Sequence, residues 1–458
     1  MHDPADDQVR ALRTALTRTP RSSSRELARA LGVSQATLSR LIRRVSGDVV
    51  VIGRGRATRY AWRREIEGVE AIVPVYEMPD AEGRPRHVAD LHPAAPDGFV
   101  LVSRVPDVPS GWFDDLPWFL QELRPSGWLG RQVPALHADL RLPPHVNDWS
   151  SDHVLRFLVE RGSDGLGALV VGAKAFRHAV TMAQAPPGAV SASERLALYA
   201  ARADAAVQQG LVGSSAGGEQ PKFLTTRDDG ERRVPVLVKF SPAARDPVAM
   251  RRRDLLVSEH LALRTLAEHG HPAARSELLV GEARVFLEVE RFDRAGPIRR
   301  VGQIALAWAD AQLVGSSLTS WTESTSALLA RGLLSADDHR EVRWRQLFGR
   351  WIANNDMHLH NLTLRLRGAT ITGVAPAYDM LPMAYAPQGQ GELRAVAFAP
   401  QPPGPEDADV AAPALEAAVD FWGRVAADAR ISAEVRAFAN ANRDAVAALR
   451  AGLIWLPE

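Results

Sequence analysis

The chain has 458 residues, which predicts two or three domains, and its composition is that of a globular protein. It contains no cysteine, which excludes disulfides and thiolate metal sites. No apolar run is long enough to span a membrane, and the acidic start of the chain lacks the apolar core of a signal peptide. We therefore expect a cytoplasmic protein that does not contact membranes.

The net charge of +1 hides an asymmetry between the beginning of the chain and the rest. Residues 1–64 hold fourteen Arg against five Asp and Glu, a net charge of +9, which leaves −8 for residues 65–458. A small basic domain on an acidic body predicts that the first part alone binds nucleic acid.

The first 45 residues have the spacing of a helix–turn–helix. Helices are expected over residues 8–20, after the serines at 22–24, and over residues 35–45 with Ser34 as N-cap. The start of the second helix of such a motif meets base edges. The residues predicted to face DNA there are Gln35, Thr37, Ser39, Arg40 and Arg43.

Residues 49–52 and 59–62 are expected to pair as a hairpin with a basic tip, which resembles the wing of a winged-helix domain. Arg54, Arg56 and Arg59 would then meet phosphate or the minor groove. The alternative is a solvated surface in a chain that uses Arg for most of its positive charge. Together with the helix spacing, the hairpin favours DNA binding.

Beyond a short linker, strand-like runs at 73–76 and 99–102 are separated by turn-rich polar segments. Residues 111–131 are dense in aromatic side chains, which we expect to form a packed core rather than a platform for stacking nucleotides. Residues 151–210 are predicted to be helical, with breaks that contain Gly and Pro.

The segment Ser214 to Lys222, with the sequence SSAGGEQPK, is rich in small residues. Glycines let backbone N–H groups approach phosphate closely. The spacing matches neither the Walker A motif nor the protein-kinase G-x-G-x-x-G. From spacing alone, a phosphate-binding loop and a simple Gly-rich turn both stay open.

Lys239 ends an apolar run that is predicted to be a buried strand, and it is one of only three lysines in the chain. Kinases use a lysine at such a place to hold the α- and β-phosphates, where Arg is a poor substitute. A surface lysine is the alternative. Glu259, on a helix expected over residues 247–269, is the candidate ion-pair partner, or else a solvated residue on the helix face.

Asp356 and Asn361 are five residues apart, and Asp379 follows a strand-like segment over residues 362–377. This spacing suits phosphoryl transfer, with Asp356 accepting the hydroxyl proton and the other two binding magnesium. Asp-x-x-x-x-Asn alone occurs by chance in many proteins, so its weight comes from the lysine before it. The other C-terminal segments are expected to be helices over 302–352 and 411–454 and a surface loop over 388–407.

Taken in order, five motifs resemble those of the HipA family of serine/threonine kinase toxins. They are SSAGGEQPK at 214–222, VK at 238–239, VERFDR at 289–294, ND-x-H-x-x-N at 355–361 and AYD at 377–379. Segments at 74–77, 116–120 and 124–131 resemble the N-terminal part of that family. The resemblance therefore covers about residues 70–458.

The resemblance implies an α+β fold and an ATP- and Mg²⁺-dependent serine/threonine protein kinase. Its parts would be a winged helix–turn–helix over 1–66, a HipA-like N-terminal lobe over 67–298 and a helical C-terminal kinase lobe over 299–458. The nucleotide-binding residues that it implies are Gly217, Gly218, Gln220, Lys222, Lys239, Glu290, Arg291, Phe292, His358, Asn361, Tyr378 and Asp379. Among these, residues 290–292 would meet adenine.

Members of this family autophosphorylate a serine in the Gly-rich loop, which shuts them off. The resemblance places that role on Ser214 or Ser215, and the register set by Lys222 favours Ser215. A phosphate there would add a charge of about −1.5 to −2 and should expel the loop from the nucleotide site.

Family members usually work with a separate helix–turn–helix antitoxin that represses the operon. Here such a module is fused in front, which indicates self-contained repression at an operator, and paired half-sites are consistent with a homodimer. The family's protein substrates include aminoacyl-tRNA synthetases, but nothing in this sequence specifies one.

Two other functions stay open. A nucleotide-sensing transcriptional regulator could have a weak or inactive kinase fold, although the intact Lys239, Asp356, Asn361 and Asp379 argue against this. A small-molecule phosphotransferase of related fold would not need the serines of the Gly-rich loop, and sugar and aminoglycoside acceptors would distinguish it.

Overall fold

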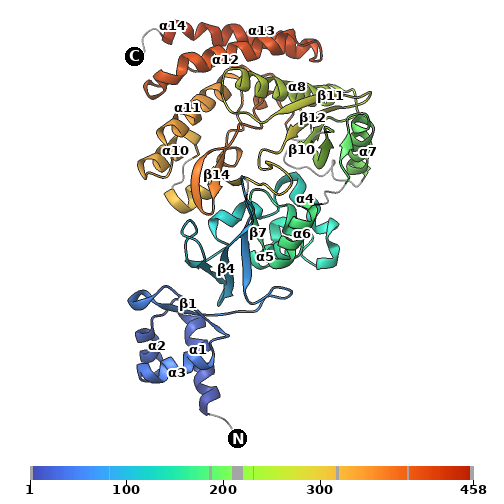
Figure 1. Ribbon diagram of the computed structural model, residues 1–458. Helices are drawn as coiled ribbons and strands as arrows, with labels where there is room; N and C mark the ends of the chain where they lie inside the picture. The colour runs from blue at the N-terminus through green and yellow to red at the C-terminus, as the bar shows by residue number, and fades with distance from the viewer. Residues whose placement is uncertain are drawn as a thin grey trace.

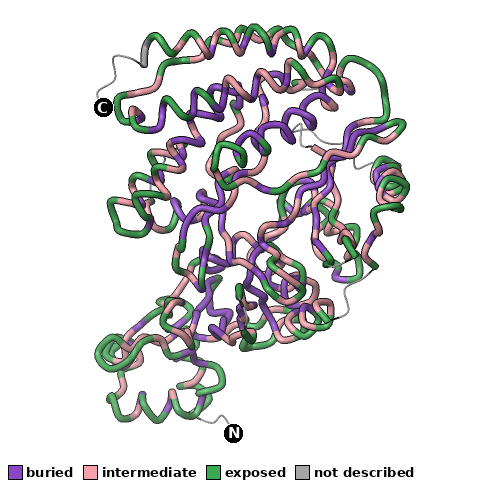
Figure 2. The backbone as a smooth tube through the Cα atoms, turned by 45° about the horizontal axis from the view of Figure 1, so that its top comes forward, coloured by how far each residue is buried: buried purple, intermediate pink, exposed green. Residues whose placement is uncertain are grey.

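The computed structural model describes residues 4–81, 83–184, 188–208, 220–230, 232–315, 319–388 and 391–453. The N-terminal domain (residues 4–66) lies at one end, the middle domain (residues 69–184) follows, and the last helices cover the opposite end (Figure 1). Buried backbone runs through the strands and the inner helices, whereas the helices of the N-terminal domain are largely exposed (Figure 2). Among the described residues, no helix combines the length and the apolar character needed to cross a bilayer.

The N-terminal domain has the three helices and the hairpin where the sequence predicts them. They are α1 (Pro4–Arg18), α2 (Ser24–Leu31), α3 (Gln35–Arg44), β1 (Val49–Ile52) and β2 (Arg59–Trp62). Ser23 caps α2 in a reciprocal capping box with Glu26, and the Ser34 side chain accepts a hydrogen bond from the backbone N–H of Thr37 at the start of α3. The spacing of polar caps and apolar residues thus determined these helices locally.

The N-terminal domain is joined to the middle domain by backbone hydrogen bonds as well as by the chain. The N–H of Ala95 donates to the carbonyl of Trp62 at 2.8 Å, and the N–H of Arg64 donates to Pro93 at 3.0 Å. The Arg64 guanidinium also pairs with Asp152. These contacts extend the hairpin onto the next sheet, so the two domains pack directly against each other.

The middle domain is built on a five-stranded antiparallel sheet. In spatial order its strands are β6 (Gly111–Phe113), β5 (Gly98–Ser103), β4 (Arg86–Ala94), β3 (Val73–Glu77) and β7 (Leu169–Val171). Its helices are α4 (Gly127–Leu136), α5 (Ser151–Arg161) and α6 (Ala173–Gln184). The sequence predicted β3 and β5 but missed β4, because buried Asp90 and His92 interrupt its apolar pattern. The aromatic segment does form core, with Trp118 and Phe119 buried.

A second five-stranded sheet follows, with α7 (Arg195–Gln208) and α8 (Pro247–Glu268). In spatial order its strands are β11 (Ser276–Val280), β12 (Val285–Glu290), β10 (Arg233–Phe240), β9 (Lys222–Asp228) and β8 (Val190–Ser191). The buried strand that ends near Lys239 and the long helix after it are therefore confirmed. The short strands β7 and β8 interrupt residues 151–210, which the sequence predicted as helices alone.

The C-terminal part combines a three-stranded sheet with helices. The strands are β13 (Gly302–Ala305), β14 (Thr363–Arg367) and β15 (Thr370–Val374), and the helices are α9 (Leu306–Ala309), α10 (Trp321–Ala330), α11 (Ala336–Trp351), α12 (Ala408–Ala427), α13 (Ala433–Ala448) and α14 (Arg450–Leu453). The prediction that residues 302–352 are all helical was wrong at their start. There Ile304 pairs with Leu364 in β14, a partner too distant in sequence for a local pattern to reveal.

Candidate active site

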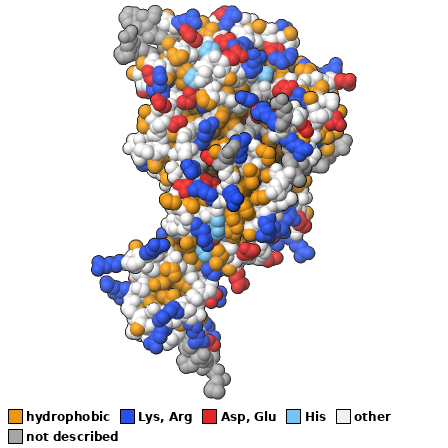
Figure 3. Space-filling model, viewed as in Figure 1, with side chains coloured by type: hydrophobic (Ala, Val, Ile, Leu, Met, Phe, Trp, Pro, Cys, Tyr) orange, Lys and Arg blue, Asp and Glu red, His pale blue; other side chains and the backbone are white. Residues whose placement is uncertain are grey.

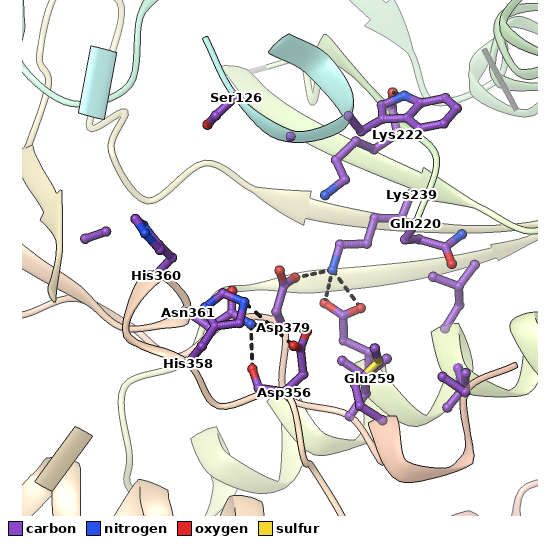
Figure 4. A pocket seen from close by; sticks show the side chains of 18 of the residues that line it. Ser126, Gln220, Lys222, Lys239, Glu259, Asp356, His358, His360, Asn361 and Asp379 are labelled. Atoms are coloured by element: carbon purple, nitrogen blue, oxygen red, sulfur yellow. Dashed lines mark hydrogen bonds and ion pairs between the residues drawn. The ribbon is translucent and has the colours of Figure 1, made fainter. Parts of the chain in front are cut away.

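A cavity of about 720 Å³ lies where the middle domain, the second sheet with α8, and the C-terminal part meet. Figure 4 shows the side chains of Lys239, Glu259, Asp356, Asn361 and Asp379 together around it. These residues come from β10, from α8 and from the loops that flank the β14–β15 hairpin. The structure therefore brings together residues that the sequence predicted to act as one site.

Lys239 is the centre of this group and is only 5% exposed. Its ammonium donates to the two carboxylate oxygens of Glu259, at 2.6 and 2.8 Å, and also to the carboxylate of Asp379. The prediction that Glu259 is the partner of Lys239 is thus confirmed, and a solvated Glu259 is excluded because that side chain is buried.

Lys239 and its acidic partner Asp379 set each other's ionisation. Burial alone would lower the pKa of Lys239, but the carboxylates of Asp379 and Glu259 outweigh it and raise the pKa above its ordinary value. Burial would raise the pKa of Asp379, but the ammonium groups of Lys239 and Lys222 lower it to about 2. The ammonium of Lys239 and the carboxylate of Asp379 are consequently both charged at neutral pH.

The loop after α11 holds Asp356 and Asn361 in a fixed arrangement. The backbone N–H of Asp356 donates to the side-chain oxygen of Asn354 at 3.1 Å, and the amide nitrogen of Asn361 donates to the backbone carbonyl of Asp356 at 2.7 Å. The side chain of Asp356 stays 47% exposed, with a nitrogen of His358 at 3.6 Å. A carboxylate that is held in place yet accessible is suited to accept a proton from a bound hydroxyl.

The backbone is strained at two positions beside the site, one just before the loop of Asp356 and the other at Asp379. Ala353 and Asp379 have φ angles of +61° and +50°, in the left-handed region that residues with a side chain seldom adopt. Such conformations persist only when the surroundings impose them, and they are concentrated at functional sites. At Asp379, the ion pair with Lys239 supplies part of that constraint.

The donors of the cavity fit magnesium rather than a thiophilic metal. Asn361 has its amide nitrogen bonded within the loop, so its oxygen and the carboxylate of Asp379 are the hard donors that Mg²⁺ prefers. No cluster of three or more His, Asp or Glu suited to a metal occurs among the described residues. A magnesium ion here would therefore take its other ligands from phosphate and water, as in kinases.

The other residues predicted to bind the nucleotide or to be autophosphorylated divide into three groups. Gln220, Lys222 and His358 line the cavity. Ser214, Ser215, Gly217 and Gly218 lie outside the described residues. Glu290, Arg291, Phe292 and Tyr378 are described but do not line the cavity.

The side chains of this last group are engaged in structural contacts. Arg291 pairs with Asp164 and Asp293, which locks the middle domain to the second sheet, and Glu290 pairs with Arg227. The Tyr378 hydroxyl donates to the carbonyl of His360 at 3.2 Å and thereby supports the loop that carries Asp356 and Asn361. The adenine contact predicted for residues 290–292 stays a prediction without support from these side chains.

The sequence did not predict that the middle domain contributes residues to the lining of the cavity. Glu122 and Trp128 line the cavity together with Trp308 and His360 of the C-terminal part. Glu122 accepts a hydrogen bond from the backbone N–H of Ala305 at 2.8 Å, and burial raises its pKa. No spacing rule could identify these residues, because only tertiary docking brings them to the site.

The residues predicted to face DNA lie mostly on the surface of the N-terminal domain. Gln35, Ser39, Arg40 and Arg43 are exposed on α3, and Thr37 is half-buried. In the hairpin, Arg54 and Arg56 are exposed and Arg59 is half-buried. Figure 3 shows basic side chains (blue) projecting from this domain.

Two family models and one curated relative match the chain. The models are "YjjJ-like toxin, middle domain" over residues 69–180 and "HipA-like C-terminal domain" over residues 214–446. The toxin YjjJ of Escherichia coli (strain K12) is 37% identical over 425 residues, which cover 92% of this chain and 94% of that protein.

Two solved structures show a looser likeness. A chain of the Shewanella oneidensis MR-1 toxin–antitoxin complex of HipA, HipB and operator DNA is 14% identical, with a TM-score of 0.49 over 82% of this chain and 96% of its own. The Helicobacter pylori proinflammatory kinase CtkA is 12% identical, with a TM-score of 0.39 over 53% and 94%. At these scores neither structure places any residue of the site.

We predict that replacing Lys239 by Met raises the pKa of Asp379 from about 2 toward its ordinary value of 3.8, because burial remains while the main attraction is lost and only Lys222 is left. The depressed pKa stabilises the folded protein above pH 3.8, and that contribution disappears as the pH falls toward 2. Carboxyl ¹³C titration by NMR measures this pKa, with Asp379→Asn to assign the resonance.

Lys174→Met is the matched control, because Lys174 pairs with Glu160 on the exposed surface. It should leave the Asp379 titration unchanged. An unchanged Asp379 pKa in Lys239→Met would contradict the electrostatic description of the cluster.

Proposed function

The chain belongs to the family of HipA-like toxins, and on that premise we propose that it is an ATP- and magnesium-dependent serine/threonine protein kinase. The observation that carries the proposal is the buried Lys239–Glu259–Asp379 cluster, which opens into the same cavity as Asp356 and Asn361. A lysine anchored by a helix Glu, with an acidic magnesium ligand and a separate catalytic Asp, is the arrangement that phosphoryl transfer requires.

In this proposal Lys239 binds the α- and β-phosphates, and Asn361 and Asp379 would hold Mg²⁺. The metal, when bound, would neutralise charge on the phosphates. Asp356 accepts the proton of a serine or threonine hydroxyl as that oxygen bonds to the γ-phosphorus and ADP leaves. Positioning and charge neutralisation supply most of the rate, so the fixed loop of Asp356 is the main contribution of the protein.

The proposal includes autophosphorylation of Ser215 or Ser214 in the Gly-rich loop. Gln220 and Lys222, which follow that loop in the sequence, line the cavity, and this supports the proposal. A phosphate on the loop would bring about two negative charges close to the carboxylates of Asp356 and Asp379. The phosphorylated loop would therefore be repelled from the site, which switches the kinase off.

We further propose that residues 1–66 form a winged helix–turn–helix that binds operator DNA, so that this toxin represses its own gene, as a homodimer on paired half-sites. The three helices, the hairpin and the exposed arginines support this. The protein substrate would be recognised by the remaining, acidic part of the chain, and an aminoacyl-tRNA synthetase is the first class to test.

Incubation of the purified protein with Mg-ATP, followed by intact and peptide mass spectrometry, tests the kinase. We expect phosphate on Ser215 or Ser214 in the wild type and none in Asp356→Asn, because that variant lacks the proton acceptor. Nucleotide binding without phosphate on any peptide would instead favour a nucleotide-sensing regulator or a small-molecule phosphotransferase.

Fluorescence anisotropy with the DNA upstream of the gene tests the operator proposal. Arg40→Ala with Arg43→Ala should weaken binding by about tenfold or more and reduce the salt dependence by roughly two ions. A double variant of equal charge change on the body, Arg264→Ala with Arg443→Ala, serves as control. Equal losses in both variants would mean that α3 does not read DNA.

A further inference from the structure

The cavity contains one arginine that has no ion-pair partner among the described residues. Four cationic side chains line it: Arg124, Lys222, Lys239 and Arg252. Lys239 is paired with Glu259 and Asp379, and Arg124 with Asp115. Lys222 interacts with the same carboxylates, since it contributes to the lowered pKa of Asp379. Arg252 makes no hydrogen bond or ion pair within the described ranges of the chain.

The position of Arg252 on α8 aims it at the active site. It lies seven residues before Glu259, so both fall on one face of the helix, together with Leu255 and Leu256, which also line the cavity. The separation along the helix axis is about 10 Å. Arg252 is half-buried and lines the cavity together with Leu381, Met383 and Pro387, which follow Asp379 in the chain.

Nearby groups that could have neutralised Arg252 are engaged elsewhere. The neighbouring Asp254 accepts hydrogen bonds from the backbone and side chain of Ser432. Within the cavity, Glu259 and Asp379 are bound to Lys239, and Glu122 accepts the backbone N–H of Ala305. The carboxylate of Asp356 has the amide of Asn361 at 3.4 Å and His358 at 3.6 Å. A half-buried guanidinium without a counter-ion has lost part of its hydration and gains most from a bound anion.

We propose that Arg252 is an anion subsite of the cavity, which binds a phosphate or carboxylate group on the acceptor. The proposal rests on the kinase function, in which Lys239 already holds the inner phosphates of the nucleotide. The substrates would then be acceptors that carry an anionic group beside the reacting hydroxyl. The planar guanidinium would bind such a group through two parallel hydrogen bonds.

The terminal phosphate of the nucleotide is the other source of the same chemistry, and calorimetry on the full chain distinguishes the two. Mg-ADP and a non-hydrolysable Mg-ATP analogue are titrated first, and inorganic phosphate is then titrated into the Mg-ADP complex. If the acceptor supplies the anion, Arg252→Gln weakens phosphate binding by about tenfold or more and leaves both nucleotides unchanged. If the nucleotide supplies it, the variant weakens the ATP analogue but not ADP.

Arg252→Lys should recover part of the phosphate affinity, because it restores the charge without the planar geometry. Arg264→Gln is the matched control, since Arg264 lies on the exposed side of the same helix and pairs with Glu268. Equal phosphate and analogue affinities in wild type and Arg252→Gln would overturn the proposal. If wild type binds no nucleotide, the kinase proposal fails, and phosphate titrated into the free protein, compared between wild type and Arg252→Gln, still decides whether the subsite exists.

Discussion

The ammonium group of Lys239 is the point on which the site depends, because it connects three parts of the chain that are distant in sequence. It fixes β10 to α8 through Glu259 and both of them to the turn at Asp379. Removing one partner of a buried ion pair typically costs about 3–5 kcal/mol, since the remaining charge stays desolvated. In the proposed function, bound phosphates would compete with the carboxylates of Glu259 and Asp379 for Lys239. Magnesium would compete with Lys239 for the carboxylate of Asp379.

The middle domain is part of this site rather than a separate attachment. Its core is continuous with that of the C-terminal part, and Asp164 pairs with Arg291 and Arg294 across the boundary to the second sheet. The same domain holds the N-terminal domain through backbone hydrogen bonds at Ala95 and Arg64.

Local chemistry made part of this structure predictable from the sequence. The helix cap at Ser34 and the strand before Lys239 followed from patterns within a few residues, and the scarcity of lysine made Lys239 a candidate. Its pairing with Glu259 was one of two alternatives that the sequence left open. The elements that the sequence did not predict depend on buried polar residues or on contacts between distant segments. Strand β4 carries buried polar residues, and β13 is a strand only because β14 pairs with it. Arg252 and Glu122 line the cavity only because distant segments pack together. Such packing produces no periodic pattern in the sequence.

The most direct test of the central claim is the effect of magnesium on nucleotide affinity, measured by calorimetry with a non-hydrolysable ATP analogue in the presence and absence of Mg²⁺. The account predicts that Mg²⁺ tightens binding by about tenfold or more in the wild type and that Asp379→Asn abolishes this gain. Binding that does not depend on Mg²⁺, or that keeps its full magnesium dependence in Asp379→Asn, would contradict the assignment of this cluster as the phosphoryl-transfer site.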